Sequence, residues 1–223
     1  MENAGQVKSK KRVADHGEVF TAEREVNAML DLVQQETERI ESRFLEPACG
    51  NGNFLAEILR RKLAVVKSRY GKNATDYERY SVIAITSIYG VEILQDNVDE
   101  CRERLFNIWD KEYSANFPND ANDETREAVR FILKHNILCG DALDMRAANG
   151  EPIFFAEWAA VNGCYLKRRD FRLDQMLEDK KTGLQLDLFG NVGSYTYDEN
   201  GTIVLAPIRE FPPVYYRKVA EHG

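Results

Sequence analysis

The chain has 223 residues, of which 43% are hydrophobic and 30% charged, and its formal net charge is −7. This length suffices for one substantial core, and the composition is that of an ordinary globular protein. No apolar stretch reaches the roughly 20 residues of a membrane helix, and the polar N-terminus does not resemble a secretory signal. We therefore expect a cytoplasmic protein. We expect no metal site, because the four cysteines form no Cys-x-x-Cys pair.

The basic residues form two small clusters, over Lys8–Arg12 and over Lys167–Arg169 with Arg172 nearby. A domain that binds DNA alone usually has a basic footprint, because phosphate contacts supply most of the affinity. The simpler interpretation of these clusters is solvated surface. Composition by itself therefore does not predict DNA binding.

Predicted strands and helices alternate as far as Asp144, after a lead-in over residues 1–15 that we expect to be flexible and basic. Such alternation is typical of a parallel sheet with helices on its faces. The first elements in chain order are an amphipathic helix over 21–40, a strand over 43–46, a glycine loop over 47–53 and a helix from Phe54 to Leu63. An exposed polar excursion over 67–80 follows, and then a helix that leads into a strand at 88–92. The last elements are a helix through 98–109, a loop over 116–123, a helix through 129–133 and a strand over 137–141.

The pattern changes after Asp144. Residues 152–158 are apolar, residues 167–178 are charged with a possible helix from Leu173, and residues 195–205 predict a β-hairpin around a glycine-bearing turn. We place a soft boundary near residue 148. It divides a domain over residues 16–148 from a β-rich C-terminal extension over residues 149–223.

The strongest motif runs from Leu45 to Leu55, with the sequence Leu-Glu-Pro-Ala-Cys-Gly-Asn-Gly-Asn-Phe-Leu. A strand that turns tightly into a helix needs glycines where side chains would collide with a ligand. The amides at the start of such a helix carry a partial positive charge, which suits a carboxylate or a phosphate. A dinucleotide-binding loop would have a third glycine where this chain has Phe54, which counts against NAD. A plain tight turn is the alternative.

Two further strands are predicted to end in acidic residues. Glu92 ends the strand over 88–92, where a carboxylate can accept both ribose hydroxyls of a nucleotide. Asp141 lies at the carboxyl end of the strand over 137–141 in the same way. The ends of these strands and of the strand before the glycine loop would converge on one crevice, which is where ligands bind in open α/β sheets. For Glu92 alone, a surface position is equally compatible with the sequence.

The segment Glu46–Leu55 resembles the S-adenosylmethionine motif of amino-group DNA methyltransferases of restriction–modification systems. Upstream, residues 16–21 (His-Gly-Glu-Val-Phe-Thr) are similar to the segment that precedes this motif in the γ-ordered adenine enzymes, with Ala22 in place of the usual proline. The resemblance covers residues 10–145. It implies a Rossmann-like methyltransferase fold and S-adenosyl-L-methionine as cofactor.

The resemblance also implies roles for individual residues. Phe20 and Thr21 would border the cofactor, Glu46 would lie near its ammonium group, and Ile93 would flank its adenine. The full set of expected cofactor-binding residues is Phe20, Thr21, Glu46, Ala48, Gly50, Asn51, Gly52, Phe54, Glu92, Ile93, Asp141 and Ala142.

The catalytic signature of this family, Asn/Asp-Pro-Pro-Tyr/Phe, does not follow Asp141. In the family it accepts hydrogen bonds from the target amine and stacks on the flipped base. The nearest similar segment is Phe211-Pro212-Pro213-Val214-Tyr215, which lacks the acceptor and is interrupted by Val214. A proline-stiffened connection is the better interpretation of it, and we assign no catalytic residue.

The sheet would also be incomplete, because only the first three parallel strands of the methyltransferase fold are evident. The strand over 43–46 would then have an unpaired edge, which either the C-terminal strands or a partner chain should cover. We therefore expect the cofactor-binding subunit of an adenine-N6 DNA methyltransferase. A second subunit would carry the catalytic loop and most of the DNA contacts. The alternatives are a catalytically inactive assembly module, and a complete small methyltransferase acting on RNA, protein or a metabolite.

Overall fold

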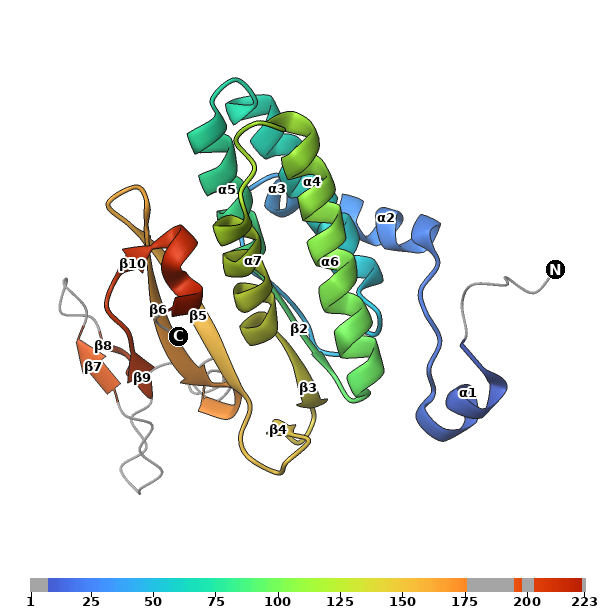
Figure 1. Cartoon of the computed structure of the whole chain (residues 1–223). Coiled ribbons are helices and arrows are strands. Elements are labelled where there is room, and N and C mark those ends of the chain that lie inside the picture. Colours follow the sequence, from blue (N-terminus) through green and yellow to red (C-terminus); the bar gives the residue numbers. More distant parts are fainter. Residues whose placement is uncertain (1–7, 176–194, 198–202, 222–223) are drawn as a thin grey trace.

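The computed structural model describes residues 8–175, 195–197 and 203–221. This part of the chain has a mixed α/β fold, as the sequence predicts (Figure 1). Its helices are α1 (Lys10–His16), α2 (Glu23–Asp31), α3 (Gln34–Thr37), α4 (Asn53–Tyr70), α5 (Ala74–Thr86), α6 (Gln95–Asn116), α7 (Asp123–Asn136) and the 3₁₀ helix η1 (Tyr216–Glu221). Its strands are β1 (Phe44–Glu46), β2 (Ile88–Glu92), β3 (Ile137–Asp141), β4 (Arg146–Ala147), β5 (Phe154–Val161), β6 (Tyr165–Arg172), β7 (Tyr195–Tyr197), β8 (Ile203–Leu205), β9 (Arg209–Glu210) and β10 (Val214–Tyr215).

The central sheet has the strand order β1-β2-β3-β4. The first three strands pair in parallel, with Leu45 opposite Tyr89 and Val91 opposite Leu138, and β4 pairs antiparallel with β3. Every residue of β2 is buried, as expected of a central strand, whereas Leu45 in β1 is 44% exposed. Within the described residues β1 has only β2 as a strand neighbour, so one edge of β1 is open.

The two faces of β2 contact different parts of the chain. A Cβ atom on Gly90 would lie 3.0 Å from Leu55 of α4, so this face carries the helical layer. Tyr89 and Val91 point the other way and cluster with Ile153 and Phe155 from the C-terminal part of the chain. The Tyr89 hydroxyl also donates to the carbonyl oxygen of Ala156 over 3.0 Å. The hairpin of β5 and β6 therefore covers a face of the sheet and leaves the edge of β1 open.

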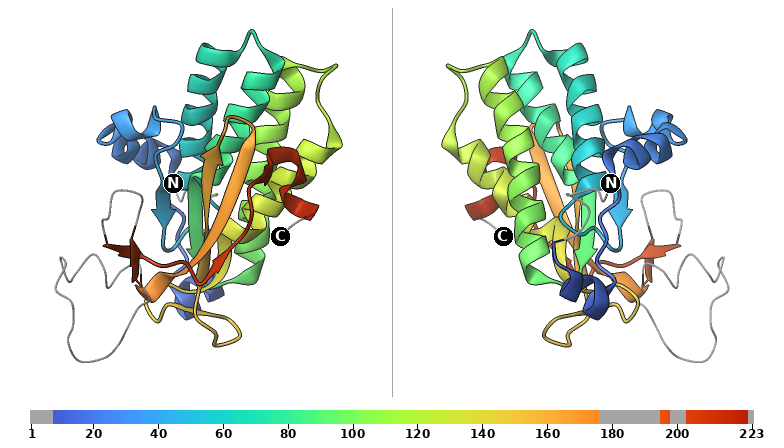
Figure 2. Two further views of the ribbon diagram at one scale, coloured as in Figure 1. Left: turned by 90° about the vertical axis from the view of Figure 1, so that its left-hand side faces the viewer. Right: turned by 90° about the vertical axis from the view of Figure 1, so that its right-hand side faces the viewer.

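The main core joins the helices to the C-terminal strands. Trp158 of β5, Leu166 of β6 and Tyr216 of η1 belong to the same apolar cluster as α4, α5, α6 and α7. Figure 2 shows β5 and β6 lying alongside the helical layer in both views. The division near residue 148 stays a prediction, and the core crosses this position.

The segment over 67–80, predicted to be an exposed excursion, is mostly helical, and residues 67–76 are exposed or half-buried as predicted. Helix α4 continues to Tyr70 and α5 begins at Ala74, with Asn73 as its N-cap. Tyr77 is fully buried and Glu78 is 3% exposed, so the prediction was wrong for these two residues. The polar composition misled because Glu78 is buried with hydrogen-bonding partners.

Glu78 of α5 joins the 3₁₀ helix η1, near the C-terminus, to the helical layer through hydrogen bonds. Its carboxylate accepts hydrogen bonds from the hydroxyls of Tyr113 and Tyr216, from Arg217 over 2.6 Å and from the Asn122 amide over 3.1 Å. Buried charges are tolerated when they are paired and hydrogen-bonded in this way. Residues from α5, α6, the loop before α7 and η1 thus meet at one carboxylate.

The segment over 21–40, predicted to be one helix, is divided in two. Val33 leaves the helical conformation at φ −122° and ψ 30°, and α3 follows it. Val26 and Leu30 face the core, but Met29 is 55% exposed and Val33 is 43% exposed. Two of the four apolar positions that predict the helix therefore do not contact the core.

The charged stretch from Lys167 forms strand β6 and becomes helical only at residues 173–175. Strands β5 and β6 meet at Asn162 and Gly163, whose φ angles of +46° and +80° are those of a tight hairpin turn. Strands β7 and β8 pair antiparallel, as predicted for the later hairpin, and the turn between them lies outside the described residues.

None of the helices in the described ranges combines the length and the apolar character that crossing a membrane would require.

Lys62 of α4 is fully buried below β1. Its ammonium donates to the carbonyl oxygen of Ile40 over 2.9 Å, to that of Ser42, and to the Ser87 hydroxyl over 2.6 Å. It thereby joins the segment before β1 to the segment before β2. Burial lowers the pKa of Lys62 to about 7, against the opposing attraction of Glu41 and Glu36.

We expect Lys62→Met to lower the free energy of unfolding by about 2–4 kcal/mol, because three buried acceptors lose their donor. The native pKa lies below the unfolded value, so the contribution of Lys62 to stability rises with pH between about 7 and about 10.5, by up to about 1.4 kcal/mol per pH unit. Urea unfolding of both proteins across this range measures the difference. Lys67→Met, at an exposed position of α4, is the matched control. If the difference in unfolding free energy between the wild type and the Lys62 variant does not change with pH, the lowered pKa of Lys62 is wrong.

Candidate functional site

The carboxyl ends of β1, β2 and β3 open onto one cavity of about 560 Å³. Parallel strands end at the same edge of a sheet, and ligands of α/β proteins bind there. The wall consists of residues 17–21, most of residues 46–54, residues 92–94 with Asn97, and residues 140–143. The predicted convergence of three strand ends is therefore present in the structure.

Eleven of the twelve residues expected from the sequence line this cavity. They are Phe20, Thr21, Glu46, Ala48, Gly50, Asn51, Phe54, Glu92, Ile93, Asp141 and Ala142. Gly52 does not line it. The wall also includes residues that sequence reasoning missed, notably Leu143, Asn97 and Val19. Leu143 is 90% exposed, and its signal was a large apolar residue just beyond a strand end.

Two glycines allow the loop between β1 and α4 to approach its neighbours. Gly50 and Gly52 have φ angles of +52° and +86°, in the left-handed region that favours glycine. A Cβ atom on Gly50 would lie 3.1 Å from the Phe20 ring, and one on Gly52 would lie 2.6 Å from the sulfur of Cys101 in α6. The absence of a side chain at Gly50 therefore lets Phe20 pack against the loop, and the absence of one at Gly52 lets the loop pack against α6.

Glu92 connects the loop to β2. Its side chain accepts hydrogen bonds from the amide of Gly50 over 2.9 Å and from the amide of Leu94 over 3.0 Å. Each carboxylate oxygen can accept a second bond, so the side chain retains acceptor capacity toward the cavity. Glu92 is only 8% exposed, which keeps this acceptor in place.

The cavity is acidic. Glu18, Glu46, Glu92 and Asp141 line it, and none of the described residues in its wall is Lys, Arg or His. Glu18 is neutralised by Arg12, whose hydrogen bond holds the pKa of that carboxyl below its ordinary value. Burial raises the pKa of Glu46, against the opposing effect of the Ala48 amide. The cavity therefore favours a ligand that carries positive charge.

One part of the site carries a partial positive charge and has the opposite preference. Helix α4 begins at Asn53, next to the cavity, and Gly52 provides no side-chain cap for its first amides. A helix start of this kind attracts a carboxylate or a phosphate. The site therefore combines several acidic side chains with one position that suits an anion.

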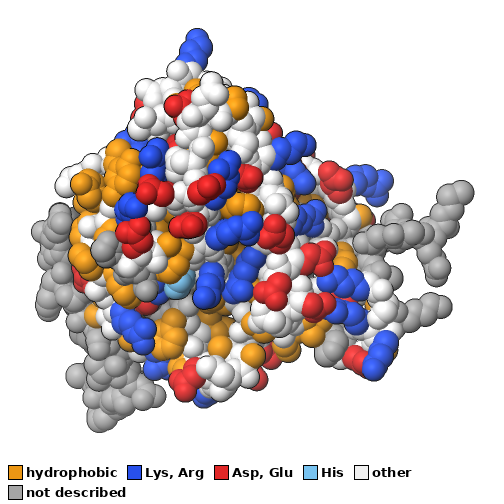
Figure 3. All heavy atoms as spheres, viewed as in Figure 1, with side chains coloured by type: hydrophobic (Ala, Val, Ile, Leu, Met, Phe, Trp, Pro, Cys, Tyr) orange, Lys and Arg blue, Asp and Glu red, His pale blue; other side chains and the backbone are white. Residues whose placement is uncertain are grey.

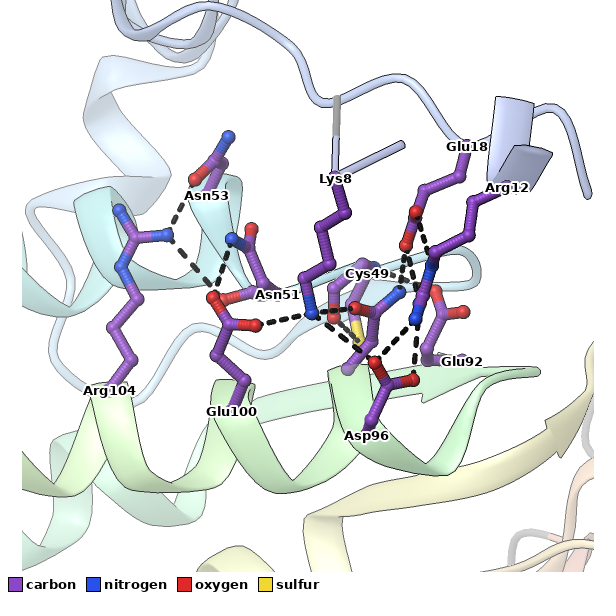
Figure 4. Close-up of polar contacts among 12 residues, drawn as sticks. Lys8, Arg12, Glu18, Cys49, Asn51, Asn53, Glu92, Asp96, Glu100 and Arg104 are labelled. Atoms are coloured by element: carbon purple, nitrogen blue, oxygen red, sulfur yellow. Dashed lines mark hydrogen bonds and ion pairs between the residues drawn. The ribbon is translucent and has the colours of Figure 1, made fainter. Parts of the chain in front are cut away.

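Asn53 fixes the residues before α2 against the loop. Its amide donates to the carbonyl oxygen of Thr21 over 2.9 Å, and its side-chain oxygen accepts from Arg104 of α6 over 2.5 Å (Figure 4). The Asn51 amide donates to Glu100, also on α6. These contacts hold Phe20 and Thr21 at the cavity wall.

The Phe211–Tyr215 segment does not line the cavity. The amide of Phe211 donates to the carbonyl oxygen of Arg168, whose guanidinium lies 4.5 Å from the Phe211 ring. Val214 pairs with Leu166 in β6. The segment is a structural connection along the C-terminal sheet, as the simpler interpretation of the sequence predicts.

The second basic cluster is neutralised by its neighbours. Lys167 pairs with Glu210, Arg168 with Asp170, Arg169 with Glu157 and Arg172 with Asp174. On the face shown in Figure 3, basic and acidic side chains also alternate over the helices. Neither feature provides a basic footprint for DNA.

Comparison with known families identifies the chain. Residues 20–152 match the sequence model of the family described as MmeI, DNA-methyltransferase domain, and this is more than half of the chain. The protein belongs to this family and is a DNA-methyltransferase domain of the restriction–modification type. Neither a search of curated proteins nor a search of solved structures gives a match.

We expect Gly52→Ala to destabilise the protein by about 1–3 kcal/mol, because the new Cβ atom would overlap Cys101 at a strained φ. Adding Cys101→Ala removes the sulfur and should restore part of that loss, whereas the backbone strain remains. Thermal unfolding of the two single variants and the double variant measures the coupling. Strict additivity of the two changes would contradict the contact between the loop and α6.

Proposed function

We propose that the cavity binds S-adenosyl-L-methionine and that the chain is the cofactor-binding part of a γ-ordered, adenine-specific DNA methyltransferase. The observation that carries this proposal is the acidic cavity at three strand ends beside an uncapped helix start. S-adenosylmethionine has a sulfonium and an ammonium group, which suit the carboxylates, and a single carboxylate, which suits the helix start. A dinucleotide would instead bring two phosphate charges into a cavity lined by Glu46, Glu92 and Asp141.

The residue roles follow the resemblance to the adenine enzymes. Glu92 would accept the ribose hydroxyls, Glu46 would lie near the ammonium group, and Ile93 would flank the adenine. Asp141 would contact the ring from the end of β3. Loop 48–52 would present its backbone to the methionine end. Gly52 would contribute indirectly, because its close approach to Cys101 fixes the position of the loop. The cofactor supplies the methyl group, and this chain binds and orients it.

The catalytic loop is proposed to lie on a partner chain. Residues 20–152 hold no Asn/Asp-Pro-Pro-Tyr/Phe sequence, and Phe211–Tyr215 lies away from the cavity. Transfer to an amine requires the nitrogen lone pair to point at the methyl group, and loss of positioning groups costs orders of magnitude in rate. A flipped adenine would therefore be held by the partner above the mouth of the cavity.

The open edge of β1 gives the partner a place to bind. Strand edges present unpaired amides and carbonyls and readily pair with another strand. The C-terminal hairpin leaves this edge free because it lies against Tyr89 and Val91 on the face of the sheet. We further propose that the partner makes most of the DNA contacts, since the net charge is −7 and the cluster over 167–172 is ion-paired.

Glu92→Gln should weaken S-adenosylmethionine binding by about 1.5–3 kcal/mol, the usual range for hydrogen bonds to a charged group. Calorimetry measures the loss. S-adenosylhomocysteine should lose a similar amount, because both ligands carry the same ribose. Glu103→Gln on α6, an exposed carboxylate paired with Arg130 outside the cavity, is the matched control. Normal binding by the Glu92 variant would place the ribose elsewhere.

The chain alone should transfer no methyl groups to duplex DNA above background, even with cofactor bound. Adding a partner that carries Asn-Pro-Pro-Tyr should restore methylation at adenine N6, and the two chains should co-purify. Tritiated methyl transfer to mixed genomic DNA, with and without the partner, measures this. Strong labelling by the chain alone would refute the division of labour. Cofactor binding without any restored transfer would favour an assembly module.

A further inference from the structure

Residues 8–19, which we call the strap, pass over the start of α6 and end in the cavity wall at Gly17, Glu18 and Val19 (Figure 4). None of the apolar side chains described in the strap is buried, although the Glu18 side chain is only 7% exposed. The apolar core begins only after it, at Phe20 and Val26. The strap is therefore not held in place by apolar packing.

Ion pairs hold the strap instead. Arg12 contacts Asp96 of α6 over 2.5 Å and Glu18 over 2.6 Å. Lys8 contacts Glu100 over 2.5 Å and the side-chain oxygen of Asn97 over 2.7 Å. The side chains of Asp96 and Glu100 are 55% and 44% exposed, so water and salt can reach this latch.

The latch is connected to the cavity through two side chains that line it. Asn97 accepts from Lys8 and donates to Glu18 over 2.7 Å, and Glu18 in turn accepts from Arg12. Asp96, by contrast, is not part of the cavity wall. Weakening the Arg12–Asp96 pair would therefore loosen the strap without removing a group that faces the ligand.

The strap also contains a conformationally free position where α1 ends. Gly17 is the C-cap of α1 with a φ of +65°, and no atom lies within 4 Å of the position of its missing Cβ. A glycine in open space can change its backbone angles without a steric cost. The anchored end follows at Thr21, which Asn53 holds on the glycine loop.

We propose that the strap is a gate, latched by Arg12 and Lys8 on Asp96 and Glu100 and anchored at Thr21, whose end at residues 17–19 must leave the cavity wall for the cofactor to bind or leave. This inference rests on the proposed binding of S-adenosylmethionine. Opening the strap breaks the Arg12–Asp96 and Lys8–Glu100 pairs, which are partly exposed and each worth less than about 1 kcal/mol. It also breaks the hydrogen bonds that Asn97 makes with Lys8 and Glu18. Salt screens exposed pairs, so the gate opens more often at high ionic strength.

The test compares Asp96→Asn with Asp99→Asn. Asp99 lies one turn later on α6, pairs with Arg102 and has a similarly exposed side chain, 63% against 55% for Asp96. Stopped-flow mixing with S-adenosylmethionine gives the association and dissociation rates. The Asp96 variant should raise both rates by about two- to five-fold, with little change in Kd, because the latch is weakened equally with and without ligand. Arg12→Gln should also raise both rates, and the Asp99 variant should match the wild type.

High salt should bring the wild-type rates toward those of the Asp96 variant. Unchanged rates in the Asp96 variant would overturn the gate. A faster dissociation with unchanged association would overturn it too, because the strap would then be a fixed wall.

Amide hydrogen exchange over residues 8–19 without ligand tests the latch separately. It should be faster in the Asp96 variant than in the Asp99 variant, and equal exchange would overturn the latch. If the wild type binds no S-adenosylmethionine, the proposed function fails, and the exchange comparison still decides whether the strap is latched.

Discussion

The close approach of the glycine loop to β2 and α6 is the constraint on which the rest of the site depends. A Cβ atom at Gly52 would overlap the sulfur of Cys101, and one at Gly90 would overlap the sulfur of Cys49. Glycine at these two positions lets the loop lie between strand and helix. Glu92 then fixes the loop by accepting from the Gly50 amide. The start of α4, the carboxylate of Glu92 and the end of β1 consequently face one cavity.

The sequence was most informative where local chemistry and tertiary role coincide. The stretch from Leu45 to Leu55 requires a tight turn into a helix whatever surrounds it, and the structure has that turn there. Glu92 and Asp141 were found because strand ends in a parallel sheet meet at one edge. Gly52 shows the limit of this reasoning. Its need for glycine was visible, but the atom that imposes it, the sulfur of Cys101, lies 49 positions further along the chain.

Polar residues with internal partners could not be predicted in the same way. Glu78 suggests an exposed segment until its contacts with Tyr113 and Tyr216 are known, and Tyr216 lies at the other end of the chain. Strand β6 is similar, since its arginines suggest surface until Glu157 and Asp170 neutralise them. The hairpin of β5 and β6 did carry a local signal, Asn162-Gly163, a pair that accommodates the positive φ angles of a tight turn. The strap could not be foreseen, because its latch depends on the placement of α6.

The C-terminal strands and the family match together define what this chain provides. The match ends at residue 152, and β5 and β6 then cover one face of the sheet while the edge of β1 stays open. The proposed role, a cofactor-binding half, would leave this strand edge for a partner. We propose that the carboxylates of the cavity give it its chemical selectivity, and the assigned role depends on that claim.

Calorimetric titration of the purified chain with S-adenosylmethionine, S-adenosylhomocysteine and NAD, under identical conditions, tests that claim most directly. An acidic cavity predicts measurable binding of the two adenosyl ligands, with the sulfonium compound at least as tight, and no binding of the dinucleotide. Binding of NAD in preference to S-adenosylmethionine, or no heat with any of the three by folded protein, would contradict it.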